Sequence, residues 1–183
     1  MEIVFVEGLP CAGKSTLIKG LEDKGYNVVH ELGRTISKSE FPGNGKNLEE
    51  VTKINSWFAE KEKDRMLNGE GIYDRSFLTH IAYAYAYERL TGIDGIFEET
   101  IRTYRDRINR GEIKIPDQIF YIDIDSDVSI DRQNEKIRED PDKALDSFWR
   151  EKRFLDDLSY AYNRILENIG GGIQVIKISG LKN

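Results

Sequence analysis

The chain has 183 residues, of which 39% are hydrophobic and 33% charged, and its formal net charge is −6. This composition indicates one folded domain with a sizeable core and excludes a disordered chain, and the negative charge argues against a nucleic-acid polymer as partner. Cys11 is the single cysteine, which rules out an internal disulfide and fits a reducing compartment. The N-terminal apolar run is too short for a signal peptide and no run approaches a membrane span, so we expect a cytoplasmic protein without a membrane partner.

Apolar runs of β type alternate with longer helical patterns along the chain. In chain order the patterns predict a strand at 3–6, a helix at 14–24, a strand at 26–30, a loop at 31–46, a helix at 48–67, a strand at 71–74, helices at 77–90 and 96–109, a strand at 118–124, helices at 127–138 and 145–169, and a strand at 173–178. The helix at 145–169 is expected to be the longest. Five strands separated by helices predict an α/β fold in one domain, residues 1–183, with a parallel sheet covered on both faces.

Functional candidates follow several of these strands. A glycine-rich loop follows the first strand, and Glu31, Asp74 and Asp123 each end or follow another apolar strand. The carboxyl ends of parallel strands meet at one edge of a sheet, where ligands bind. We therefore expect the loop and the three carboxylates to converge on one active site.

The loop reads Gly-Leu-Pro-Cys-Ala-Gly-Lys-Ser over residues 8–15, which fits the phosphate-binding pattern Gly-x4-Gly-Lys-Ser between a strand and a helix. Its glycines let the backbone curl with N–H groups inward, and the helix N-terminus adds partial positive charge. Lys14 would reach the β- and γ-phosphates, and Ser15 would supply a hydroxyl to magnesium. The expected nucleotide contacts are Gly8, Pro10, Cys11, Ala12, Gly13, Lys14, Ser15 and Thr16.

Three classes of protein share such a loop. A GTPase would carry Asn-Lys-x-Asp and an Asp-x-x-Gly after a strand, and the sequence has neither, which also favours ATP as the donor. A motor, transporter or helicase ATPase usually needs partner motifs and a larger chain. The segment 119–123 resembles the acidic strand of such an ATPase, but no other feature supports this class. A small-molecule kinase needs one domain, an acceptor pocket and a closing basic lid, and the remaining features favour this class.

Two short segments are candidates for the acceptor side of the site. Asp74 can hold magnesium through water or orient the acceptor, and Arg75 can clamp a phosphate oxygen; the alternative is that Asp74 only caps a helix. Glu31 would bind a sugar hydroxyl or take a proton from one, and Arg34 would bind an acceptor phosphate, unless both belong to a solvated loop. Of two adjacent aromatic residues on one helix, one is expected in the core, and Phe58 is the candidate that contacts the acceptor.

A basic segment at about 132–146 lies between two predicted helices. Phosphoryl transfer needs cations around the transferring group and the exclusion of water, so we expect a lid here, with Arg132 and Arg138 as its catalytic cations. Acidic residues are mixed through the segment, and an exposed charged face is the alternative.

Taken together, these motifs resemble the thymidylate kinase group of the P-loop nucleoside and nucleotide kinases. The resemblance covers most of the chain and rests on the first strand with its loop, on Asp74-Arg75, on 116–125 before Arg132, on 154–162 and on 175–180. It implies a three-layer fold with strand order 2-3-1-4-5, ATP and Mg²⁺ as co-substrates, a nucleoside monophosphate as acceptor and often a homodimer.

The favoured interpretation is therefore a nucleoside monophosphate kinase of thymidylate-kinase type. Its expected catalytic residues are Lys14, Asp74, Arg75, Arg132 and Arg138, its acceptor contacts Glu31, Arg34, Phe58 and Arg75, and its metal ligands Ser15 and Asp74. Ser76 after the Asp-Arg pair is closer to deoxynucleoside kinases, so a kinase of a nucleoside or other metabolite hydroxyl, with Glu31 as base, is the alternative. A regulatory module that binds nucleotide without transfer is a third.

Overall fold

The computed structural model describes residues 2–143, 145 and 147–180. Its centre is a five-stranded sheet in the order β2-β3-β1-β4-β5, and each pairing is parallel. The strands are β1 (Ile3–Gly8), β2 (Val28–Val29), β3 (Gly71–Asp74), β4 (Gln118–Asp123) and β5 (Gln174–Ser179). The predicted parallel sheet and the strand order implied by the resemblance are confirmed.

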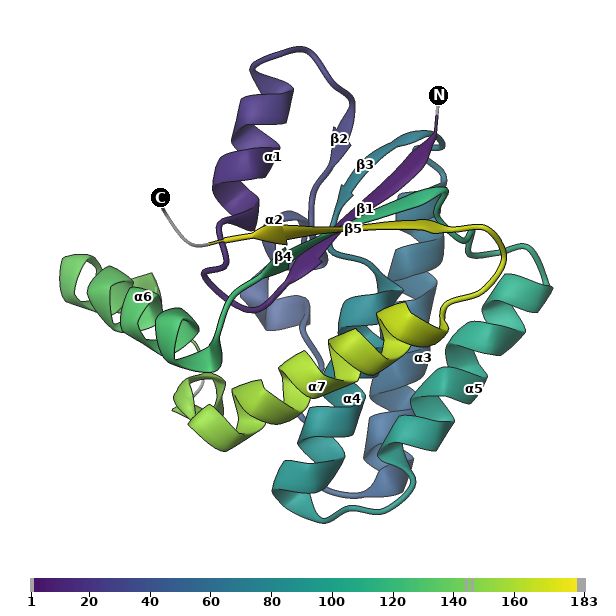
Figure 1. Cartoon of the computed structure of the whole chain (residues 1–183). Helices are drawn as coiled ribbons and strands as arrows, with labels where there is room; N and C mark the ends of the chain where they lie inside the picture. The colour runs from purple at the N-terminus through teal and green to yellow at the C-terminus, as the bar shows by residue number, and fades with distance from the viewer. Residues whose placement is uncertain (1, 144, 146, 181–183) are drawn as a thin grey trace.

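Helices cover the sheet from both sides (Figure 1). Helix α1 (Lys14–Glu22) lies on one side, and the helices α3 (Leu48–Met66), α4 (Phe77–Thr91), α5 (Ile96–Asn109) and α7 (Lys152–Asn168) gather on the other. The short helix α2 (Leu32–Thr35) and the 3₁₀ turn η1 (Lys38–Glu40) lie within the predicted loop at 31–46, and α6 (Ser126–Glu139) follows β4. This arrangement confirms the three-layer fold.

The core forms where the central strands meet α4 and α7. Phe5 on β1 is fully buried and contacts the rings of Tyr73 and Phe77 edge-on. The ring of Tyr121 on β4 packs against the ring of Tyr162 on α7, with 5.4 Å between their centroids. Central strands buried on both faces read as continuous apolar runs, so the polar residues at their carboxyl ends stand out as candidates for function.

The prediction of one long helix at 145–169 is wrong, because α7 begins at Lys152. Two 3₁₀ turns precede it, η2 (Pro141–Lys143) and η3 (Ser147–Arg150), and Glu151 is extended, with φ −80° and ψ 119°. Phe148 fits the helical spacing, but its ring packs from η3 against Tyr83 and Phe154. Among the described residues the longest helix is instead α3, with 19 residues against 17 in α7.

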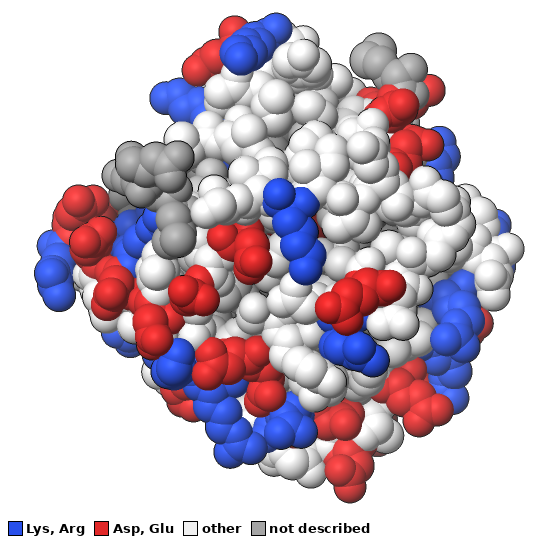
Figure 2. Space-filling model, viewed as in Figure 1, with Lys and Arg blue, Asp and Glu red and all other residues white. Residues whose placement is uncertain are grey.

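The predicted lid is divided between a helix and irregular chain. Its first part, through Glu139, belongs to α6, while η2 and η3 occupy the connection to α7. Residues 144 and 146 of the predicted lid, and residues 1 and 181–183 of the predicted domain, lie outside the described residues. On the face shown in Figure 2, acidic and basic side chains are interspersed. No helix in the described part of the chain is both long enough and apolar enough to cross a membrane.

Candidate active site

Residues 8–15 connect β1 to α1, as the motif predicts. Gly8 has φ 146°, and a Cβ atom there would lie 2.6 Å from the carbonyl oxygen of Ile122, so only glycine fits. Gly13 is the N-cap of α1 in the left-handed conformation, with φ 109°. Because glycine brings no capping side chain, the first N–H groups of α1 are left for an anionic ligand.

Lys14 lies inside this loop. Its Nζ donates to the carbonyl oxygens of Gly8 at 2.9 Å and Leu9 at 2.7 Å, and the residue is 6% exposed. Burial lowers the pKa of Lys14 to about 7, with a smaller contribution from Arg75. The ammonium group is therefore held where a phosphate would meet it, at a pKa that makes its charge sensitive to pH near neutrality.

Arg34 links the two residues predicted to hold magnesium. Its Nη2 donates to Ser15 Oγ at 2.7 Å and lies 3.7 Å from Asp74 Oδ2. Asp74 is 1% exposed, and burial raises the pKa of its carboxyl, with the negative charge of Glu31 next in importance. A cationic group thus already sits between a hydroxyl and a carboxylate oxygen, the hard ligands that Mg²⁺ prefers. These residues fit a magnesium site completed by phosphates and water, although the described residues contain no cluster of three or more side chains that would hold a metal by themselves.

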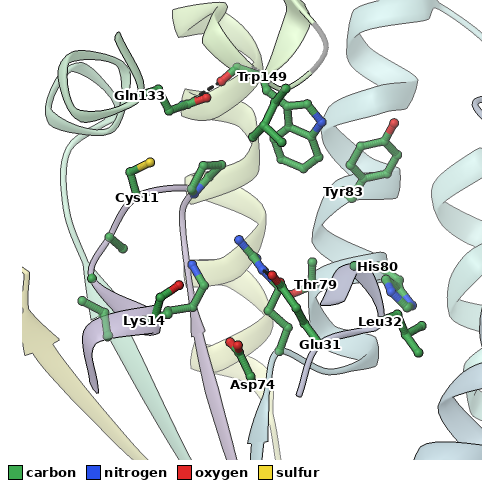
Figure 3. Close-up of a pocket in the computed structure, with 18 of the residues that line it drawn as sticks. Cys11, Lys14, Glu31, Leu32, Asp74, Thr79, His80, Tyr83, Gln133 and Trp149 are labelled. Carbon is green, nitrogen blue, oxygen red and sulfur yellow. Dashed lines mark hydrogen bonds and ion pairs between the residues drawn. The ribbon is translucent and has the colours of Figure 1, made fainter. Parts of the chain in front are cut away.

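Glu31 is placed between two arginines. Its Oε2 lies 2.9 Å from Arg75 Nε, and its Oε1 lies 3.7 Å from Arg34 Nε. Arg75 also donates through Nη1 to the carbonyl oxygen of Gly8 at 3.3 Å. Arg34 and Arg75, two of the predicted acceptor residues, therefore contact the phosphate loop, and Figure 3 shows Glu31, Asp74 and Lys14 around the same space.

Glu7 is a buried carboxylate that sequence reasoning missed. It is fully buried at the end of β1 and accepts hydrogen bonds from Ser76 Oγ at 2.5 Å, Thr79 Oγ1 at 2.6 Å and Tyr162 OH at 3.1 Å. Burial raises its pKa, and the hydroxyl donors oppose that shift. A charged residue within a strand buried on both faces was the available signal, because such a group must find partners. Through these bonds Glu7 fixes the start of α4 beside the phosphate loop.

A cleft of about 1590 Å³ opens over the phosphate loop and continues between α3, α4 and η3. Pockets for one drug-sized ligand are typically about 300–1,000 Å³, so this cleft has room for two. Its far end is aromatic and is lined by Phe58, His80, Tyr83, Tyr87 and Trp149; three of these rings are labelled in Figure 3. Burial lowers the pKa of His80 to about 3, so the ring is neutral.

Trp57 and Phe58 are both only partly buried, so the expectation that one of them lies in the core is wrong, and contact between Phe58 and an acceptor stays a prediction. Phe58 lines the cleft, and its ring lies 4.7 Å from that of His80. Trp57 is not among the described residues that line the cleft. Lys61 Nζ lies over its ring, 5.6 Å from the centroid, and the ring also contacts that of Phe41.

Helix α6 docks onto the phosphate loop. Arg132 donates to the carbonyl oxygens of Cys11 at 3.2 Å and Gly180 at 2.8 Å, and Ser129 Oγ donates to that of Pro10 at 2.7 Å. Gln133, one helical turn after Ser129, donates through Nε2 to the carbonyl oxygen of Trp149 at 2.9 Å, which connects α6 to η3. Arg132 therefore lies at the cleft, as expected.

Two other predicted residues lie away from this cleft. Arg138 is exposed on α6 and is not among the described residues that line the cleft, so its catalytic role stays a prediction. The expectation that Asp123 converges on the same site is wrong, because it lines a separate pocket of about 390 Å³ with Lys152 and Asp156. Side chains alternate along a strand, and Asp123 shares the face of Tyr121, which packs against α7.

Comparisons with known proteins agree with the fold and the loop. The model of the family described as AAA domain matches residues 3–169. Structures of the deoxyadenosine kinase from M. mycoides share the fold: the form with bound dATP has TM-score 0.71 at 17% identity, over 97% of this chain and 91% of that one. The form with bound dCTP has TM-score 0.69 at 15% identity, over 97% and 90%. No curated protein matches the sequence.

Proposed function

The chain belongs to the AAA domain family, and from this premise and the geometry of the cleft we propose that it is an ATP-dependent kinase that phosphorylates a hydroxyl of a nucleoside. The observation that carries the proposal is the pairing of Glu31 with Arg75 at 2.9 Å, beside the phosphate loop and at the entrance to the aromatic end of the cleft. A carboxylate in this position can accept the proton that a hydroxyl loses as it attacks phosphorus.

The charges around Glu31 favour a hydroxyl acceptor over a phosphate. Arg75 and Arg34, the cations expected to bind an acceptor phosphate, are both engaged by carboxylates, and Arg34 also contacts Ser15. A second phosphate here would meet the negative charges of Glu31 and Asp74, and like charges at close range are unfavourable. The name of the structurally similar enzyme, deoxyadenosine kinase, supports the same class of acceptor.

The aromatic end of the cleft suits a nucleoside base. Planar rings from three elements, Phe58 of α3, Tyr83 of α4 and Trp149 of η3, line a space that a flat heteroaromatic ring can enter. Stacking on such rings is favourable for every base because each has a π-face. A base seated there would direct its sugar towards Glu31.

In the proposed reaction, the acceptor oxygen forms a bond to the γ-phosphorus of ATP, the bond to the β-phosphate oxygen breaks, and the hydroxyl proton passes to Glu31. Lys14 and the amides of the loop hold the donor phosphates, and Arg75 orients Glu31. Bound Mg²⁺, held by Ser15 and Asp74 with the phosphates, would neutralise charge that develops on the phosphate oxygens. Arg132 fixes the loop through Cys11 and contributes positive charge.

A nucleoside monophosphate kinase is the second candidate, and one observation favours it. The side chain of Arg34 is 38% exposed, so it can turn from its carboxylate partners to an incoming phosphate. In that case Glu31 only binds the acceptor. The homodimer implied by the resemblance and the cytoplasmic location remain predictions.

The test is ADP release from ATP and magnesium with a panel of nucleosides, nucleoside monophosphates and a blank without acceptor. We expect turnover with at least one nucleoside well above the blank. Turnover with monophosphates alone would replace the proposal by the second candidate. Release at the rate of the blank across the panel would reject both and leave a nucleotide-binding module.

A further inference from the structure

Arg65, near the end of α3, connects the ends of two strands. The residue is 7% exposed, and its Nη2 donates to three backbone carbonyl oxygens: Val29 at 3.3 Å, Asp74 at 3.0 Å and Arg75 at 3.2 Å. Val29 is the last residue of β2, and Asp74 is the last residue of β3. One guanidinium group therefore joins the two strand ends from which the acceptor residues emerge.

The guanidinium is itself held in place. Its Nη1 lies 2.7 Å from Oε1 of Glu62, which is 1% exposed, and the group sits over the ring of Tyr73, 5.6 Å from the centroid. A planar guanidinium can stack on an aromatic ring while its donors point outward in a fixed fork, and the ammonium group of a lysine cannot. The position thus requires arginine for its geometry as well as its charge.

The backbone that Arg65 contacts is otherwise held by short strand pairings, Val29 with Tyr73 and Asp74 with Val6. Strand β2 has only two residues, and Glu31 follows it after one further residue. Arg75 has φ 61°, an uncommon value for a residue other than glycine, which persists only where the surroundings hold it. Its N–H donates to the carbonyl oxygen of Val6 at 3.0 Å, and its carbonyl oxygen accepts from Arg65.

We propose that Arg65 is a positioning residue that sets the distance and orientation between Glu31 and Arg75, with Glu62 as its counter-charge. Arg65 holds the end of β2 against the end of β3, so the carboxylate from one strand meets the guanidinium from the other at 2.9 Å. The catalytic consequence rests on the proposed function, since the pair matters for turnover only if it works on the acceptor. The structural consequence, the geometry of the pair, does not depend on it.

The first readout is the side-chain Nε–H signal of Arg75 in a ¹H–¹⁵N NMR spectrum, identified by its loss in Arg75→Lys. We expect Arg65→Lys to shift or broaden this signal while most backbone signals stay in place. Arg107→Lys is the matched control, because Arg107 also pairs with carboxylates, Glu60 and Glu112, but lies away from the strand ends. In the control the Arg75 signal should not move.

The second readout is kinetic. Displacement of catalytic groups by about 1 Å costs roughly 10²-fold in rate, so Arg65→Lys should lower kcat by about 10- to 100-fold. The KM for ATP should stay within about twofold, because the phosphate loop keeps its own contacts. Because partial unfolding also lowers the apparent kcat at unchanged KM, kcat is calculated per mole of folded protein, measured by thermal denaturation, and Arg107→Lys should keep both constants.

If Arg65→Lys does not fold, Glu62→Gln decides the matter, because it retains arginine and side-chain shape and removes only the counter-charge. It should move the Arg75 signal in the same direction by a smaller amount. An Arg75 signal that stays unchanged in the folded variant overturns the proposal, whatever the turnover. Failure of the wild-type protein to phosphorylate any nucleoside would instead reject the proposed function, and the NMR comparison would still decide the role of Arg65.

Discussion

Glu31 and Arg75 come from the ends of different strands and form an ion pair with 2.9 Å between Oε2 and Nε. Arg75 also reaches the carbonyl oxygen of Gly8, so the pair touches the phosphate loop on one side. On the other side it faces the aromatic end of the cleft. In the proposed reaction, the donor phosphate and the acceptor meet at this pair.

Replacing Glu31 by glutamine tests its role as base. Glu31→Gln keeps the shape and can still accept a hydrogen bond from Arg75, but it cannot take a proton. General base catalysis typically contributes about 10²- to 10⁴-fold, so kcat with a nucleoside should fall by that amount, with the acceptor KM within about threefold. Glu22→Gln, which removes a surface carboxylate paired with His30, is the control. A Glu31→Gln enzyme with wild-type kcat would exclude the base.

Lys14→Met tests the phosphate loop. Loss of a preorganised cation at the transferring group costs several kcal/mol, or at least roughly 10³-fold in kcat/KM for ATP. The protein should stay folded, because methionine removes an ammonium group whose burial is unfavourable, as its lowered pKa shows. Steady-state kinetics and thermal denaturation check the two parts. Lys19→Met, an exposed change on the same helix, should affect neither, and wild-type turnover in Lys14→Met would refute the assignment of the loop.

The pKa of Lys14, lowered to about 7 by burial, predicts that ATP affinity depends on pH. Phosphates bind the charged ammonium, so binding takes up a proton above pH 7, and affinity should fall as pH rises from 7.5 to 9. The slope approaches about tenfold per pH unit at most, and phosphate ionisation near pH 6 lies below this window. Calorimetry in buffers of different ionisation enthalpy measures the proton uptake. Lys14→Met should abolish it, and a flat profile in the wild type would contradict the lowered pKa.

The lowered pKa of Lys14 also makes the free energy of unfolding depend on pH. Lys14 has a folded-state pKa below that of the unfolded chain, so the folded state binds fewer protons between about pH 7 and 10.5. Its contribution to the free energy of unfolding therefore becomes more favourable as pH rises through that window. The difference between wild type and Lys14→Met, measured by denaturant titration, should shrink from pH 7 to pH 10.

Local signals explain why much of the fold is predictable. The bounds of β3 and α5 match their predictions, because β3 begins at Gly71 and α5 begins directly after Gly95, and the positive φ of each glycine marks where the preceding chain ends. The start of α7 is not predictable in this way. Phe148 continues the helical spacing of apolar residues, and only its contacts with α4 show that a turn can satisfy the same pattern.

Some residues of the site can also be predicted from local sequence, and others cannot. Lys14 and Ser15 follow from a contiguous motif, and Glu31 and Asp74 follow from their places after strands. The partners of Glu7, and Val29 among the partners of Arg65, are far away in sequence, so the roles of Glu7 and Arg65 appear only when the elements are assembled. Asp123 shows the limit of the strand-end rule, because alternation along the strand turns its side chain to the face of α7.

Gly8 provides a test of backbone geometry that is separate from catalysis. Its φ of 146° and the approach of 2.6 Å to the carbonyl oxygen of Ile122 leave no room for a methyl group. Strained φ together with a backbone clash costs on the order of 2–4 kcal/mol, and for a chain of this size each kcal/mol lowers Tm by about 2–4 °C. Gly8→Ala should therefore lower Tm by roughly 4–16 °C and weaken ATP binding, because β1 and β4 must separate.

Gly20→Ala is the matched control: a Cβ there meets nothing within 4 Å in α1, and alanine in a helix interior stabilises by about 0.5–1 kcal/mol. Equal Tm values for Gly8→Ala and wild type would show that the loop and β4 do not pack as closely as these distances require.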